Sequence, residues 1–129
     1  MNQDPFYCYD FHDARVICVV RKEDIIEIAF ENAGLNKEHS QASGKYWDIT
    51  KGVLLLHGVT DEEAIFWSGN QVSETHPAPQ IPIDLIMKAE YVNGVLRMEG
   101  FLKDVPWYTW NIKTNNCSVN ILEKIEVNN

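Results

Sequence analysis

"IDLIMKAEYVNGVLRMEGFLKD", residues 83–104, is the stretch that decides the fold. At its centre, Asn93-Gly94 separates two runs in which apolar and polar side chains alternate. A type I′ turn requires positive φ at both central residues, and an Asn-Gly pair is strongly favoured there. The stretch is therefore predicted to form a β-hairpin with this dipeptide at its tip.

The turn fixes the register of the hairpin by placing Val92 opposite Val95. Pairs of opposite charge then share one face: Glu90 with Arg97, Lys88 with Glu99, and Asp84 with Lys103. The other face is mainly apolar. Turn chemistry and charge pairing thus favour the same register independently of each other.

A second hairpin is predicted at residues 14–31, "ARVICVVRKEDIIEIAFE", because β-branched residues dominate both of its halves. With a three-residue loop at 22–24, the side chains of Val16, Cys18 and Val20 lie on one apolar face. These three residues are therefore expected in the core.

Three further segments complete the expected sheet. Residues 45–59 are predicted to form a strand, and residues 106–127 a third hairpin with Asn115-Asn116 at its tip. Residues 60–69 allow two interpretations. Thr60 and Glu63 have the spacing of a helix capping box, whereas "AIFW" also suits a short strand.

The expected fold class is mainly β. An antiparallel β-sandwich or half-open barrel of at least six strands, built from hairpins, fits the pattern, with one short helix near 60–68 as the open alternative. A chain of 129 residues suits one domain, so residues 1–129 are expected to form a single β-rich unit.

The charge balance excludes several classes of partner. Eleven basic and 19 acidic side chains give a formal net charge of −8, which is unfavourable for binding nucleic acid or an anionic membrane. The three cysteines have no zinc-type spacing and are expected to be buried free thiols. The first residues lack the pattern of a signal peptide, and no apolar run could span a membrane, so a cytoplasmic location is expected.

The cluster in "YDFHDARV" (9–16) combines Asp10, His12 and Asp13, which could in principle hold a metal ion or act in catalysis. The other histidines fall in unrelated segments without a ligand spacing. These residues are therefore interpreted as polar groups that fix the start of a strand. No catalytic residue, metal or cofactor is expected.

The candidate partner-binding residues are carboxylates at turns and segment edges, together with two aromatic residues near a strand start. Exposed carboxylates can meet lysines and arginines of a partner, and aromatic side chains stabilise interfaces efficiently. The set consists of Asp61, Glu62, Glu63, Glu74, Asp84, Trp107 and Tyr108.

"FHDARVICVV" followed by "DIIEIAF", with the late "WYTWNI…CSVNI", resembles a group of small bacterial β-domains with an "HDA" segment. Some of these are similar to immunity proteins of polymorphic toxin and contact-dependent growth inhibition systems. The resemblance covers both ends of the chain, but not residues 35–80. It implies a non-enzymatic cytoplasmic protein that binds and neutralises a cognate, basic toxin domain.

Two other functions remain open at the level of sequence. One is a β-domain that binds a small molecule or carbohydrate through exposed tryptophan and tyrosine side chains. The other is a hydrolase or isomerase that uses His12 and Asp10 in the mouth of a barrel.

Overall fold

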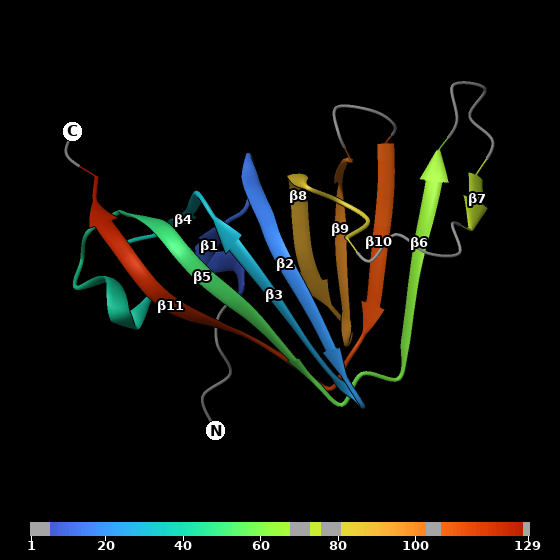
Figure 1. The fold of residues 1–129 in the computed structure, drawn as a ribbon. Coiled ribbons are helices and arrows are strands. Elements are labelled where there is room, and N and C mark those ends of the chain that lie inside the picture. Colours follow the sequence, from blue (N-terminus) through green and yellow to red (C-terminus); the bar gives the residue numbers. More distant parts are fainter. Residues whose placement is uncertain (1–5, 68–72, 76–80, 103–106, 128–129) are drawn as a thin grey trace.

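The computed structural model describes residues 6–67, 73–75, 81–102 and 107–127, and it confirms a mainly β fold with antiparallel strands (Figure 1). Two short 3-10 turns, η1 (Phe6–Cys8) and η2 (Ser40–Ala42), are the helical elements of this part of the chain. The strands are β1 (Tyr9–Asp10), β2 (Ala14–Lys22), β3 (Ile25–Glu31), β4 (Ala33–Leu35), β5 (Trp47–His57), β6 (Asp61–Trp67), β7 (Ser73–Thr75), β8 (Leu85–Val92), β9 (Val95–Phe101), β10 (Trp107–Lys113) and β11 (Asn116–Glu126).

The strands form one open sheet that bends into two halves. Its order is β1-β4-β5-β3-β2-β8-β9-β10-β6-β7, and β11 pairs with β5. We call β1–β5 with β11 the first half-sheet, and β6–β10 the second half-sheet. They meet where the start of β2 pairs with the start of β8, through Ala14↔Ile86 and Arg15↔Leu85. The strands converge towards one end and spread apart at the other (Figure 1).

The convergent end is held together by backbone hydrogen bonds between turns. Val59 donates to the Asp24 carbonyl, Thr60 to the Lys113 carbonyl, and Thr114 to the Gly94 carbonyl. These bonds join connections that belong to both half-sheets. They therefore hold the two half-sheets together at this end.

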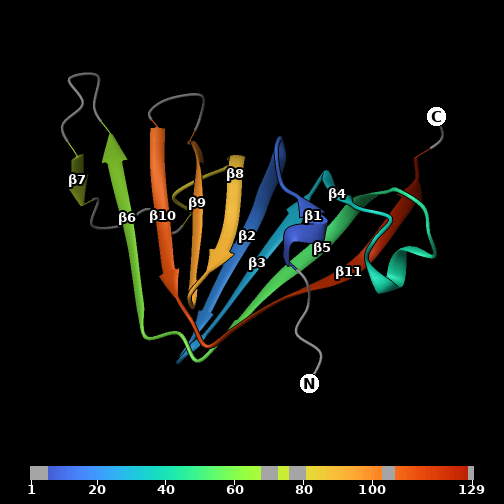
Figure 2. The same cartoon turned by 180° about the vertical axis from the view of Figure 1, so that it is seen from behind.

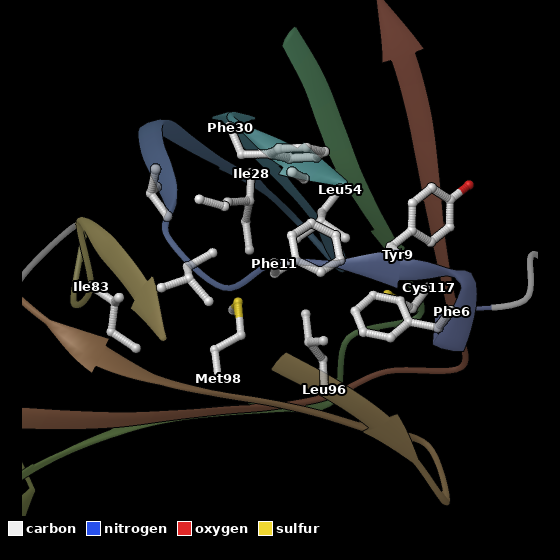
Figure 3. Close-up of a cluster of buried hydrophobic side chains, with 14 of the residues drawn as sticks. Phe6, Tyr9, Phe11, Ile28, Phe30, Leu54, Ile83, Leu96, Met98 and Cys117 are labelled. Carbon is white, nitrogen blue, oxygen red and sulfur yellow. The ribbon is translucent and has the colours of Figure 1, made fainter. Parts of the chain in front are cut away.

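The core lies between the inner faces of the two half-sheets. Ile28, Phe30 and Leu54 of the first half-sheet face Leu96 and Met98 of the second (Figure 3). The segment of η1 and β1 lies against the first half-sheet near β4 (Figure 2). Phe6 and Phe11 of this segment stack with ring centroids 5.3 Å apart, and they fill the space between the halves (Figure 3).

The hairpin around Asn93-Gly94 is confirmed, with φ of 52° and 78° at the two turn residues. Glu90 faces Arg97 and Lys88 faces Glu99, as predicted. Beyond these pairs, a bulge between Ile86 and Lys88 shifts the register by one residue, so Ile86 faces Gly100. The predicted pair of Asp84 with Lys103 falls outside the described residues, because Lys103 is not among them.

The hairpin at 14–31 forms, but its predicted loop is wrong. The turn has two residues, Glu23 and Asp24, and a bulge between Val16 and Cys18 shifts the register. Val16 faces Phe30 and is buried, whereas Cys18 and Val20 are exposed. The bulge therefore reverses which side chains face the core in the second part of β2, so that Cys18 and Val20 point outward.

Two other expectations are corrected by the sheet pairing. Residues 61–67 form strand β6 between β10 and β7, so the short helix near 60–68 is wrong. Residues 106–127 contain two strands that do not form a hairpin, because β10 pairs with β9 and β6 while β11 pairs with β5. The chain crosses from one half-sheet to the other between them.

Candidate interaction surface

The structure places most of the predicted partner-binding residues on neighbouring strands. Asp61, Glu62 and Glu63 lie on β6, Glu74 lies on β7, and Trp107 and Tyr108 begin β10. Asp84 stands apart, just before β8 at the joint between the half-sheets, where its carbonyl accepts a hydrogen bond from the Val16 amide. The side chains of Glu74 and Trp107 lie outside the described part of the structure.

Glu62 points inward and is engaged within the molecule. Arg21 Nε donates to Glu62 Oε1 at 2.8 Å, and Arg21 Nη2 donates to Oε2 at 2.6 Å. The indole Nε1 of the fully buried Trp110 donates to Oε2 at 2.9 Å. This carboxylate therefore links β2, β6 and β10, and it contributes little to an external surface.

The same contacts set the ionisation of the pair. Burial raises the pKa of Glu62, but the hydrogen bonds from Arg21 and Trp110 and the charge of Arg21 outweigh it, so the pKa is lowered overall. The hydrogen bond to Glu62 raises the pKa of Arg21. Both groups are thus held in their charged forms at neutral pH.

Tyr108 is buried, which corrects its assignment as an exposed aromatic contact. Its side chain is 3% exposed, and burial raises the pKa of its hydroxyl. Side chains of a strand point to opposite faces in turn, so Tyr108 lies on the same inner face as the buried Trp110 and Ile112.

Asp61 and Glu63 are exposed on the outer face of the second half-sheet, where neighbouring strands offset their charges. Asp61 faces Lys113, and Glu63 faces Asn111, which in turn faces Arg97. Glu90 lies on the other side of Arg97. Acidic and basic side chains thus alternate across this face, so negative charge is not concentrated there.

The outer face of the first half-sheet has a different character. Val20, Glu27 and Leu55 lie side by side across β2, β3 and β5, and the next row consists of Cys18, Ala29 and Val53. Ile17, at the bulge, is 54% exposed, and Val20 is 42% exposed. We call the apolar members of this set the outer patch: Ile17, Cys18, Val20, Ala29, Val53 and Leu55.

Glu27 is the one charged side chain in the two rows described for these strands, and it is exposed within the outer patch. A contiguous apolar patch on the surface of a monomer often marks a contact with another molecule. A partner that covers this patch would remove water from Glu27, which is costly unless the partner supplies a positive charge. The patch therefore favours an apolar partner surface that carries a lysine or arginine.

Two apolar runs in the sequence correspond to strands of the outer patch. "VICVV" (16–20) and "VLLL" (53–56) are apolar without alternation, and such a run has apolar side chains on both faces of a strand. The sequence does not indicate the position of the bulge in β2, which is why the prediction that Cys18 and Val20 lie in the core is wrong.

The polar residues of "YDFHDARV" form the turn between β1 and β2. Asp10 Oδ1 accepts a hydrogen bond from the His12 amide at 3.0 Å, and Asp13 has a left-handed φ of 71°. His12 Nδ1 lies 3.1 Å from Asp13 Oδ2 on the exposed surface. Within the ranges described above, no group of three or more His, Cys, Asp or Glu side chains could hold a metal ion.

None of the helical turns in the described ranges has the length or apolar character needed to cross a membrane. Comparisons with known proteins add no assignment. The chain matches no family model, and no curated protein or solved structure shows significant similarity to it.

Proposed function

We propose that this protein is a non-enzymatic immunity protein that acts in the bacterial cytoplasm by binding and neutralising a basic toxin domain. The observation that carries the proposal is the outer patch, with exposed Glu27 among its apolar side chains. The net charge of −8 would accelerate the encounter with a cationic partner, and the apolar side chains would supply the affinity. The resemblance to immunity proteins supports the same class.

A partner other than a second copy of this chain fits the patch better. In a twofold-symmetric contact centred on the patch, the two Glu27 carboxylates would approach each other as water is removed. Two chains that each carry −8 also repel one another. A cationic partner has neither disadvantage.

The test uses charge substitutions of matched exposure. Ile17→Lys and Val20→Lys place a positive charge on the outer patch, where it would repel a basic partner. Val92→Lys is the control, because Val92 and Ile17 are both 54% exposed and Val92 lies on the second half-sheet. Tagged variants are used to recover proteins from the native host, with identification by mass, and the recovered protein is tested as an inhibitor of cell growth.

We expect the wild type and Val92→Lys to retain one basic protein that inhibits growth in their absence, and both patch variants to lose it. Equal recovery by all four proteins would reject the outer patch as the interface. Recovery of no protein at low salt by the wild type would reject the immunity function itself.

A further inference from the structure

A groove opens at the edge of the first half-sheet, away from the outer patch. It lies among η1, β1, β4 and the start of β5, and its volume is about 540 Å³. This volume falls within the range of about 300–1,000 Å³ that is usual for small-molecule sites.

Four of the ten residues that line the groove are aromatic. Tyr7 and Tyr46 are 80% and 45% exposed, respectively, while Tyr9 and Trp47 lie deeper. The inner rings are fixed in place, because the Tyr9 hydroxyl lies in a 3.0 Å hydrogen bond with His39 Nε2 and the Trp47 indole donates to the Ala42 carbonyl at 2.7 Å. The deeper rings of the groove are therefore held in place, whereas Tyr7 and Tyr46 are exposed to a ligand.

The lining of the groove carries a negative charge. Asp10 is the charged residue that lines the groove, and none of the lining residues is a lysine, arginine or histidine. A phosphate or carboxylate ligand would meet no cation among the lining residues, and it would be repelled by Asp10 and by the net charge of the chain. The groove thus disfavours anions.

Two of these rings already lie close to ammonium groups of the protein. Lys124 Nζ is 4.6 Å from the centroid of the Trp47 ring, and Lys37 Nζ is 5.9 Å from the centroid of the Tyr46 ring. Both distances are within the range of a cation–π interaction. Neither lysine lines the groove, but these contacts show that both rings are placed where they can interact with an ammonium group.

We propose that this groove binds a small organic cation with an alkylated ammonium group. The ammonium group would lie against Tyr7 and Tyr46, with the Asp10 carboxylate supplying the opposite charge. The combination of several aromatic faces with one carboxylate is the chemistry that recognises quaternary ammonium compounds. The proposal goes beyond the protein partner, because Ile17 and Val20 lie outside the groove.

The experiment compares choline with 3,3-dimethylbutan-1-ol, in which a carbon atom replaces the charged nitrogen. Binding of both compounds to the full chain is measured by isothermal titration calorimetry. The two compounds have nearly the same shape, so a difference between them reports the charge. We expect choline to bind about tenfold more tightly. Tyr7→Ala and Asp10→Asn should each weaken choline binding by about fivefold or more, without lowering the unfolding temperature.

Asp13→Asn is the matched control, since Asp13 is an exposed aspartate three residues from Asp10 and does not line the groove. It should leave choline binding unchanged. Equal binding of choline and its isostere, or no binding of either, would overturn the proposal. So would preferential binding of N-acetylglucosamine, which would identify the groove as a carbohydrate site.

Discussion

At the scale of single residues, two glycines define how closely the strands approach. A Cβ atom on Gly52 would lie 2.5 Å from Cζ of Phe30, a buried ring that has little room to move. A Cβ atom on Gly100 would collide with the Leu85 carbonyl oxygen, next to the bulge in the β8–β9 ladder. Both positions therefore require glycine because of close contact, since neither has a positive φ.

We expect Gly52→Ala to lower the free energy of unfolding by about 1–3 kcal/mol, the usual cost of overpacking. Gly100→Ala should cost more, because its obstacle is backbone and not the end of a side chain. Gly34→Ala is the control, since its Cβ would meet Asp10 Cβ at an ordinary 3.4 Å. Urea unfolding measures all three, and an equal loss in the three variants would refute the explanation by close contact.

At the scale of elements, a hairpin with a characteristic turn could be predicted from the sequence, whereas bulges and pairings between distant strands could not. The Asn93-Gly94 turn has a backbone requirement that its two residues satisfy by themselves, so its hairpin and first charge pairs were correct. The bulge in β2 has no comparable signature, and one extra residue moved Cys18 and Val20 from the core to the surface. Alternation in a sequence gives the phase of a strand only as far as the next bulge.

The candidate site shows the same limit. Asp61 and Glu63 are exposed as expected, but Glu62 is bound to Arg21, which is 41 positions away in the sequence. Strands β10 and β11 follow each other with a short connection and yet join different half-sheets. No local pattern distinguishes such a crossing from a hairpin, and the groove among η1, β1, β4 and β5 likewise depends on strand pairings that the sequence does not indicate.

The contact of Glu62 with Arg21 and Trp110 should make stability depend on pH. Because the folded pKa of Glu62 lies below its unfolded value of about 4.5, its contribution is fully present above that pH and is lost as the pH falls through the folded value. Glu62→Gln should cost about 1 kcal/mol at neutral pH, a modest figure because both partners are partly exposed.

Urea titrations from pH 7 down to about pH 3 measure this effect. The difference between wild type and Glu62→Gln should shrink below the unfolded pKa. Glu63→Gln, on the outer face of the same strand, should differ little from wild type at any pH. A loss in Glu62→Gln that stays constant across the titration would show that packing, and not charge, explains its effect.

At the scale of the whole molecule, the two half-sheets should unfold as one unit. Their inner faces share a single core, and turns of both halves are hydrogen-bonded at the convergent end. At the joint, the Val16 amide donates to the Asp84 carbonyl at 3.0 Å. Neither half could keep its apolar face buried if the other unfolded.

Hydrogen exchange of the Leu54 and Leu96 amides tests this, because both residues are fully buried and lie on opposite halves. We expect both amides to report the free energy obtained from urea unfolding. Val16→Pro removes the amide hydrogen at the joint, and it should lower both values equally. Val16→Ala, which keeps that hydrogen, separates the loss of side-chain packing from the loss of the joint. Slow exchange at Leu96 together with fast exchange at Leu54 would mean that the two half-sheets unfold independently. The outer patch would then belong to a half-sheet that can unfold while the other stays folded.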